Sequence, residues 1–294
     1  MAKIGIIGTG FLGRAVALRL LKTGHKVIVY NRTAKKAESL KEFGAEIASS
    51  PKDVAKECDL VITIVRDAKA VEEVAFGKDG IVEGRHEGLV VAEMSTINPI
   101  SSREIARKFL ENGISMIDTP VMGGPNLAEK GEVVLMIGGD KKVYEKYKKV
   151  LDFIGSKHFY LGENGSGHAM KLVMNIQIAI LALGLSEGIT LARAASLNPE
   201  TFLEILNSTY FKTGMSLNKG PKMIKGNFEP TFSLKMMKKD LDTISETAGQ
   251  LGISLPVSSL ANKIYQDAEK SGFADIDYTG ILAFIDKISG LKKN

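Results

Sequence analysis

The sequence predicts an α/β protein in two parts: a domain with a doubly wound parallel sheet over residues 1–164 and an all-helical domain over residues 165–294. Three observations lead to this prediction. The chain has 294 residues, more than a single hydrophobic core usually serves. In the first part, short β-branched apolar runs alternate with helix-length patterns, as in parallel sheets. From about Gly165 the strand patterns stop and helical patterns follow one another.

The predicted strands of the first domain are apolar runs bounded by polar residues or glycine. KIGIIG (Lys3 to Gly8) is the first, and FLGRAVALRLLKTG after it has helical spacing and stops at Gly24. KVIVYN (Lys26 to Asn31) is the second, with a helical segment after it to about Phe43. Further strands are predicted in DLVITIV, LVVAEMS and ISMIDTPV, with helices such as SSREIARKFLENG between them.

The second domain is predicted to contain only helices, the first of which joins the two domains. Its polar residues at 171, 175, 177 and 187 leave it short of the roughly 18 to 20 apolar residues of a membrane span, so we expect no membrane association. The predicted helices are Ala169 to Ala195, Pro199 to Asn207, Leu234 to Leu251, Pro256 to Ser271 and Tyr278 to Leu291.

Composition excludes several classes of function. The net charge is +5 with scattered lysines, whereas a nucleic-acid site would gather them into a patch. The single Cys58 cannot form an intramolecular disulfide, and no signal-like segment opens the chain, so we expect a cytoplasmic protein. No metal site is expected, because the histidines form no ligand cluster with Cys58 or with paired carboxylates: they are His25, His86, His158 and His168.

The first strand-to-helix turn carries a dinucleotide-binding pattern. GTGFLG places Gly8, Gly10 and Gly13 at the spacing G-x-G-x-x-G, where glycine permits the tight turn, the approach of a pyrophosphate and close helix packing. The helix N-terminus adds donors for that anion. We therefore predict a cofactor site over the whole loop, which also includes Thr9, Phe11 and Leu12.

The end of the second strand favours NADP, with NAD possible. An NAD site usually has Asp or Glu here for the ribose 2′-hydroxyl, but this chain reads Tyr30-Asn31-Arg32-Thr33. Arg32 can pair with a 2′-phosphate, and Asn31 and Thr33 can add donors. The alternative is that Arg32 is an ordinary exposed arginine.

Six segments in order along the chain resemble the β-hydroxyacid dehydrogenase family, which includes 3-hydroxyisobutyrate dehydrogenase, tartronate semialdehyde reductase and the glyoxylate/succinic semialdehyde reductases. The resemblance implies a Rossmann-like N-terminal domain, a helical C-terminal domain joined by a long helix, and a homodimer or homotetramer. It also implies reversible hydride transfer between a nicotinamide and a short hydroxy acid. The segments are GTGFLG, YNRT, EMSTINP, DTPVMGGPNLAEKG, GHAMKLVMN and KMMKKDL.

The resemblance implies a site for a small carboxylate substrate in DTPVMGG. Gly123 and Gly124 match the family segment, whose backbone and serine hold the carboxylate, but Met122 stands where that serine is common. Backbone donors at the two glycines suit an anion all the same. Without the resemblance, this segment reads as a strand end and a turn.

Two further segments imply contacts with the cofactor. Thr96 in EMSTINP resembles the family's nicotinamide and substrate contact, although Ser95 or Thr96 before Pro99 also suits a helix N-cap. Val65 and Arg66 lie where the family commonly has Leu-Pro beside the adenosine half of the cofactor. Arg66 either adds charge near the pyrophosphate or faces water.

The long helix carries the predicted catalytic group. Gly167, Lys171 and Asn175 are spaced four apart and share one helical face. A lysine in so apolar a helix is snorkelling, paired or functional, and the match to the family pattern makes Lys171 the general acid and base. Asn175 would orient the substrate, with Gly167 leaving room for it. In KMMKKDL, the resemblance implies that Lys239 reaches the cofactor or substrate and that Asp240 fixes its helix.

Two alternatives to a hydroxyacid dehydrogenase remain open at this point. One is an imine reductase-like enzyme, although relatives with that activity generally lack the lysine that this chain has as Lys171. The other is a nucleotide-binding interaction module without catalysis, against which Lys171 and Asn175 argue and which Met122 leaves open.

Overall fold

The computed structural model describes residues 3–291 and divides into two compact units, Met1–Leu172 and Val173–Asn294. The division falls inside helix α8 (Ser166–Ala194), so the first turns of that helix belong to the first unit. The predicted boundary, between residues 164 and 165, lies just before this helix.

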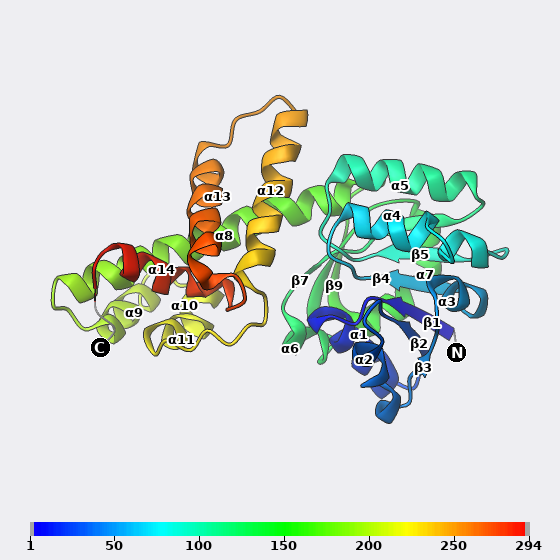
Figure 1. Cartoon of the computed structure of the whole chain (residues 1–294), viewed down its shortest axis with the longest axis horizontal. Coiled ribbons are helices and arrows are strands. Elements are labelled where there is room, and N and C mark those ends of the chain that lie inside the picture. Colours follow the sequence, from blue (N-terminus) through cyan, green and yellow to red (C-terminus); the bar gives the residue numbers. More distant parts are fainter. Residues whose placement is uncertain (1–2, 292–294) are drawn as a thin grey trace. The chain divides into compact units, whose positions relative to one another are not determined.

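The first unit is built on a six-stranded parallel sheet with the strand order β3-β2-β1-β4-β5-β6 (Figure 1). This is the order of a doubly wound nucleotide-binding sheet, and it confirms the predicted fold class. The strands are β1 (Lys3–Ile7), β2 (Lys26–Tyr30), β3 (Glu46–Ile47), β4 (Leu60–Thr63), β5 (Val90–Glu93) and β6 (Ser115–Asp118). The helices are α1 (Phe11–Lys22), α2 (Ala34–Glu38), α3 (Pro51–Glu57), α4 (Ala68–Phe76), α5 (Pro99–Glu111), α6 (Pro125–Ala128) and α7 (Lys141–Ile154).

Successive strand residues pack into two different apolar layers. Ile6 lies in a core with residues of α1, α2, α6 and α7, whereas Ile7 lies in a core with residues of α3, α4 and α5. Because side chains alternate across a strand, each strand must be apolar on both faces. This is why the predicted strands read as continuous apolar runs.

The segment ISMIDTPV, predicted as one strand, is two strands in different sheets. After β6, Thr119 still donates its N–H to the Glu93 carbonyl at 2.7 Å, but Pro120 has no N–H with which to continue the ladder. The chain turns there, and β7 (Val121–Met122) pairs antiparallel with β8. The second sheet, β7-β8-β9, includes two strands that were not predicted, β8 (Val133–Ile137) and β9 (Gly155–Tyr160).

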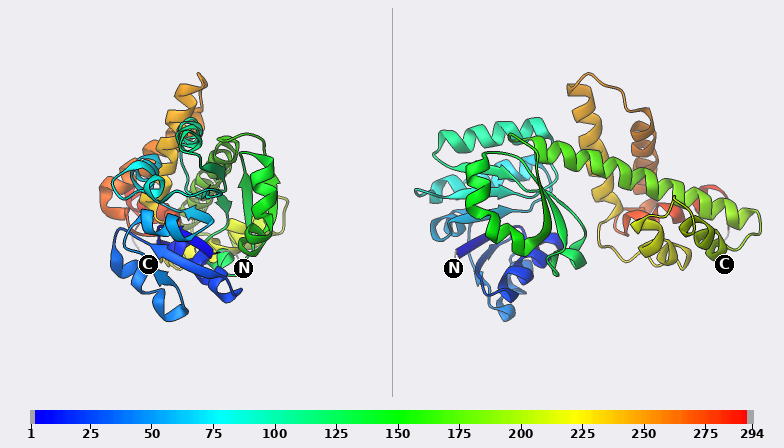
Figure 2. Two further views of the ribbon diagram at one scale, coloured as in Figure 1. Left: turned by 90° about the vertical axis from the view of Figure 1, so that its right-hand side faces the viewer. Right: turned by 180° about the vertical axis from the view of Figure 1, so that it is seen from behind.

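The second unit is helical, as predicted. Its core includes Ile189 of α8 and residues from three further segments, Leu203, Met223 and Leu282. Helices α12 and α13 pack side by side (Figures 1 and 2). The helices after α8 are α9 (Pro199–Asn207), α10 (Gly214–Asn218), α11 (Gly220–Ile224), α12 (Leu234–Gln250), α13 (Pro256–Ala268) and α14 (Ile281–Ile288).

Contrary to the expectation from its polar residues, helix α8 is long and apolar enough to cross a membrane by length and composition alone. Core helices of soluble proteins share this property. Of the most apolar 18-residue stretch of this helix, 39% is buried inside the protein.

Candidate functional site

The loop after β1 leaves space at one of its three glycines. Gly8 has φ of +102°, and a Cβ there would lie 2.1 Å from the carbonyl oxygen of Ile64. A Cβ on Gly13 would lie 1.9 Å from the carbonyl oxygen of Gly8, whereas a Cβ on Gly10 would meet nothing within 4 Å. Gly8 and Gly13 are therefore needed by the fold itself. The open space beside Gly10, at the N-terminus of α1, suits a pyrophosphate.

The end of β2 holds this loop in place. Asn31 Oδ1 accepts a hydrogen bond from the Thr9 N–H at 3.0 Å, and Asn31 Nδ2 donates to the Thr33 carbonyl at 3.0 Å. Asn31 thus links the loop to the turn before α2, a role the sequence did not predict. Thr9 Oγ1 is buried without a hydrogen-bond partner among residues 3–291. A bound cofactor would satisfy such an atom, so the loop fits a dinucleotide.

The other predicted cofactor residues near the glycine-rich loop and the end of β2 lie at the surface or at the edge of the core. Arg32 is 89% exposed, with Nη1 4.0 Å from Glu73 Oε2 of α4. Exposed pairs of this kind contribute little to stability, so Arg32 is not required by the fold. Thr33 precedes α2 without capping it through its side chain. Phe11 is exposed, and Leu12 packs against the core.

The end of β4 meets the glycine-rich loop at the point where the strand order reverses. A Cβ on Gly8 would lie 3.3 Å from Val65 Cγ1, so Val65 lies next to the loop. The Val65 N–H donates to Ser95 Oγ at 2.9 Å. Arg66 is largely exposed and donates from Nε to Asp67 Oδ2 at 2.7 Å. Both interpretations of Arg66 stay predictions, because an exposed arginine beside the loop can either face water or add charge near a pyrophosphate.

Thr96 does not cap the helix that follows it. The N-cap of α5 is Asn98, whose Oδ1 accepts the Ile100 N–H at 2.8 Å, and Pro99 takes the first helical position as expected. The N-cap interpretation of Ser95 and Thr96 is therefore wrong. Thr96 is partly exposed within a buried stretch, as a residue that contacts a ligand must be.

A buried acid that the sequence analysis missed, Glu93, supports this loop from the end of β5. Its Oε1 accepts the Ser95 N–H at 2.7 Å, and Thr63 Oγ1 donates to its Oε2. Burial raises the pKa of Glu93 to about 7, against the opposing effect of the hydrogen bonds from Ser95 and Thr63. Asp118, its register partner on β6, raises this pKa further. The sequence feature that could have revealed Glu93 is an acidic residue at the end of an otherwise apolar strand.

We expect Glu93→Gln to remove a pH dependence of stability. An acid whose pKa rises from about 4.3 when unfolded to about 7 when folded stabilises the protein below pH 4.3, and this contribution is lost as pH rises through 7. Between pH 5.5 and 8 the loss amounts to about 2 kcal/mol. The melting temperature of the wild type should therefore fall relative to that of Glu93→Gln by roughly 4 to 8 °C over this range. Parallel pH profiles would contradict the assignment.

The predicted catalytic lysine is half-buried in the second turn of α8. Lys171 Nζ lies 3.4 Å from Met122 Sδ on β7, so the predicted catalytic residue contacts the predicted substrate segment. Gly167 has a different role from the one predicted. A Cβ there would lie 2.6 Å from the Met136 carbonyl oxygen and 2.8 Å from Asp118 Cβ, so Gly167 lets the helix pack against β6 and β8.

The two glycines after Met122 differ in the space around them. Gly123 has φ of +129°, and a Cβ there would lie 2.9 Å from Val133 Cγ1. At Gly124, which precedes α6, an added Cβ would meet nothing within 4 Å. The backbone beside Gly124 is therefore accessible to a ligand in the way that the predicted carboxylate site requires.

In the second unit, Asp240 brings together the two other predicted substrate residues. Asn175 Nδ2 donates to Asp240 Oδ2 at 2.6 Å, and Lys239 Nζ lies 2.6 Å from Asp240 Oδ1. Asp240 and Asn175 are buried. The sequence predicted that Asp240 fixes its own helix, but not that it holds Asn175 of α8, because the pairing joins residues far apart in the chain.

Two other chemistries find little support in the part of the chain that the structure describes. Among residues 3–291, no three His, Cys, Asp or Glu side chains gather in the arrangement of a metal site. Cys58 is buried in the first unit, and burial raises the pKa of its thiol to about 12. A thiol with so high a pKa is a poor nucleophile at neutral pH.

Comparison with known proteins agrees with a dinucleotide-dependent oxidoreductase, the class that this fold and glycine-rich loop define. The family described as the NAD binding domain of 6-phosphogluconate dehydrogenase matches residues 3–162, and that described as NAD-binding of NADP-dependent 3-hydroxyisobutyrate dehydrogenase matches residues 165–285. Glyoxylate/succinic semialdehyde reductase 1 of Arabidopsis thaliana is 34% identical over 280 residues, which are 95% of this chain and 97% of that protein.

Two solved structures share the fold. 3-Hydroxyisobutyrate dehydrogenase from Salmonella typhimurium has a TM-score of 0.88 at 24% identity, covering 97% of this chain and 100% of that one. Psf3 in complex with NADP+ and 2-OPP has a TM-score of 0.90 at 23% identity, covering 96% and 99%. The chain belongs to the β-hydroxyacid dehydrogenase family. It is an NAD(P)-dependent hydroxyacid dehydrogenase.

Proposed function

We propose that this protein is an NADP-preferring reductase of small aldehyde or keto acids, with Lys171 as its general acid and base. Substrates of this class are succinic semialdehyde, glyoxylate, methylmalonate semialdehyde and tartronate semialdehyde. The observation that carries the proposal is the position of Lys171. Helix α8 holds it half-buried, in the same unit as the glycine-rich loop, with its ammonium 3.4 Å from Met122 Sδ.

A lysine in this position can supply the proton that the reaction needs. When bound, the reduced nicotinamide supplies the hydride that adds to the carbonyl carbon of the substrate. Lys171 stabilises the negative charge that develops on the carbonyl oxygen and donates a proton to it, giving the hydroxyl group. In the oxidative direction, the neutral amine of Lys171 accepts that proton. A thioether is a weak hydrogen-bond acceptor, so a substrate oxygen would bind the ammonium more strongly than Met122 does.

Met122 bears on which acid is the substrate. The family's serine would donate a hydroxyl to the substrate carboxylate, and a thioether has no proton to donate. In this segment, the backbone N–H groups at Gly123 and Gly124 would therefore bind the substrate carboxylate. The methionine also adds apolar surface beside Lys171. Contacts of Asn175 and Lys239 with the substrate remain predictions.

The preference for NADP rests on Arg32 and on the absence of an acid at the end of β2. An exposed guanidinium at this position can exchange its long contact with Glu73 for charge-assisted hydrogen bonds to a 2′-phosphate. One matching family supports this choice, since it is described as NAD-binding of NADP-dependent 3-hydroxyisobutyrate dehydrogenase.

The test is steady-state oxidation of NADPH and NADH with a panel of semialdehydes and 2-oxo acids, in the wild type and in Arg32→Ala. We expect turnover of at least one panel member, with a higher kcat/KM for NADPH. Arg32→Ala should lower the ratio of kcat/KM for NADPH to that for NADH by about 10- to 100-fold, because it removes a hydrogen bond between charged groups. The NADH reaction should stay unchanged.

Arg107→Ala is the matched control, since Arg107 is an exposed arginine on α5 that pairs with Glu111. A wild type that prefers NADH, or equal losses with both cofactors in Arg32→Ala, would contradict the role of Arg32. Absence of turnover with every panel member would contradict the substrate class.

A further inference from the structure

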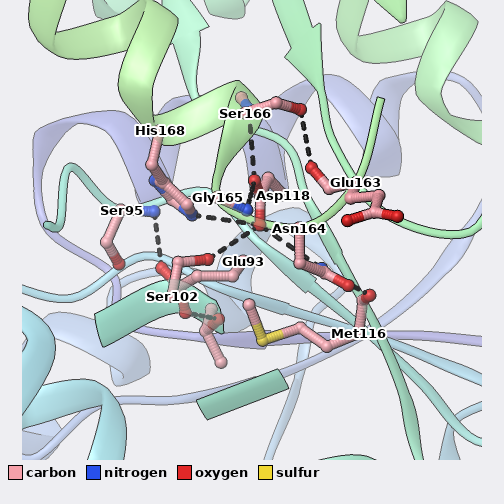
Figure 3. A network of polar contacts seen from close by, with 12 residues as sticks. Glu93, Ser95, Ser102, Met116, Asp118, Glu163, Asn164, Gly165, Ser166 and His168 are labelled. Carbon is pink, nitrogen blue, oxygen red and sulfur yellow. Dashed lines mark hydrogen bonds and ion pairs between the residues drawn. The ribbon is translucent and has the colours of Figure 1, made fainter. Parts of the chain in front are cut away.

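A buried carboxylate at the end of β6 accepts hydrogen bonds from two backbone amides at the start of the helix that carries Lys171, one just before the helix and one in its first turn. Asp118 is fully buried, and its Oδ2 accepts the Gly165 N–H at 2.6 Å (Figure 3). The same oxygen accepts the Gly167 N–H at 3.2 Å. The first N–H groups of a helix have no partners within the helix, and a carboxylate is the strongest acceptor that the chain can offer them. The N-terminus of α8 is thus fixed to the sheet through one side chain.

The same carboxylate is held from three other directions. Ser102 Oγ of α5 donates to Asp118 Oδ1 at 2.8 Å, and Asn164 Nδ2 lies 3.4 Å from the same oxygen. The buried His168, on α8 itself, places Nε2 3.7 Å from Oδ1 (Figure 3). Asn164 Nδ2 also donates to the Met116 carbonyl at 2.9 Å. Asp118 therefore cannot shift without disturbing α5, β6 and the loop before α8.

Close packing fixes the remaining freedom of the helix. The missing side chain of Gly167 allows its backbone to lie against the Met136 carbonyl of β8 and against Asp118. Met122, which contacts Lys171, pairs with Val134 of the same strand β8. The position of Lys171 relative to Met122 is therefore set by contacts of α8 with β6 and β8. Lys171 lies four residues past Gly167, about 6 Å along the helix axis.

We propose that Asp118 is a positioning residue for Lys171, acting through the N-terminus of α8 and without touching the substrate. This inference rests on the proposed function, in which Lys171 transfers the proton. A displacement of about 1 Å in a catalytic group can cost about 10²-fold in rate. Loss of the carboxylate should therefore reduce the chemical step and leave cofactor binding in place.

The experiment compares Asp118→Asn with the wild type, each with and without Lys171→Ala, on the best substrate of the panel. We expect Asp118→Asn to lower kcat by about 10- to 100-fold, with the KM for NADPH changed less than about twofold. In the Lys171→Ala background, the same substitution should change the residual rate less than about threefold, because the group that it positions is gone. Residual rates are measured at high enzyme concentration.

Asp140→Asn is the matched control. Asp140 caps α7 in the same unit by accepting the Lys142 N–H at 2.6 Å, and Asn caps a helix about as well as Asp. We expect its kcat to stay within about twofold of the wild type. If Asp118→Asn does not fold, Ser102→Ala replaces it and removes one donor to the carboxylate, with an expected three- to tenfold loss of kcat that again requires Lys171.

The outcomes separate the two proposals. Equal effects of Asp118→Asn with and without Lys171, or a lower melting temperature with unchanged kcat, would show a structural role only and overturn the positioning role. An unchanged rate in Lys171→Ala alone would overturn the proposed function itself.

Discussion

Lys171→Ala should lower kcat by about 10² to 10⁴-fold, the usual range for loss of a proton-transferring side chain. Lys171 contacts Met122 and lies outside the glycine-rich loop, so the dissociation constant for NADPH should change less than about twofold. The variant should also melt close to the wild type, because the Lys171 side chain is only half-buried and alanine favours the helix. Stopped-flow and steady-state NADPH oxidation, with NADPH titration by fluorescence, measure the two effects separately.

Lys148→Ala is the control for this prediction. Lys148 lies on α7 in the same unit and pairs with Asp152 one turn along the helix, at 3.0 Å. Its replacement should leave kcat and cofactor binding unchanged. A Lys171→Ala variant that keeps more than about a tenth of the wild-type kcat would assign proton transfer to another group.

Gly10→Ala should weaken cofactor binding at little cost to the fold. The added methyl group meets no protein atom within 4 Å, so it can clash only with a ligand. Crowding by one methyl group in a packed contact typically costs about 1 to 3 kcal/mol, which corresponds to a roughly 5- to 150-fold weaker Kd for NADPH. Fluorescence titration gives the Kd, and thermal melting without cofactor gives the stability.

Two further glycines serve as controls for this second prediction. Gly13→Ala should destabilise the apoprotein, because its methyl group would lie 1.9 Å from the Gly8 carbonyl oxygen. Gly249→Ala, on α12, also adds a methyl group in open space and should change neither property. If Gly10→Ala binds NADPH as tightly as the wild type, the pyrophosphate does not lie beside Gly10.

The sequence predicted those features that depend on local pattern. Alternating apolar runs predicted β1, β2, β4 and β5, and residue spacing predicted α8, α9, α12, α13 and α14, with α9 at the expected bounds. The short helices α10 and α11 were not predicted. These elements follow from periodicity, which a single segment contains in full. The glycine pattern predicted the loop for the same reason.

The features that the sequence analysis missed depend on contacts between distant residues. The break at Pro120 needed knowledge that β8 was available to pair with Val121 and Met122. Asp118 and Glu93 each looked like the polar end of a strand, and only the assembled sheet shows that both are buried and fully engaged. The pairing of Asn175 with Asp240 spans 65 residues, beyond the reach of any local pattern.

The chemistry of Cys58 has a practical consequence for following this enzyme in solution. It is the only cysteine of the chain, and with a thiol pKa of about 12 it carries very little thiolate at neutral pH. Maleimide reagents should therefore leave the folded native protein unlabelled. A cysteine introduced at Tyr210, which is 90% exposed, would then accept a fluorophore alone, and the response of the helical unit to coenzyme or substrate could be recorded without first removing a native residue.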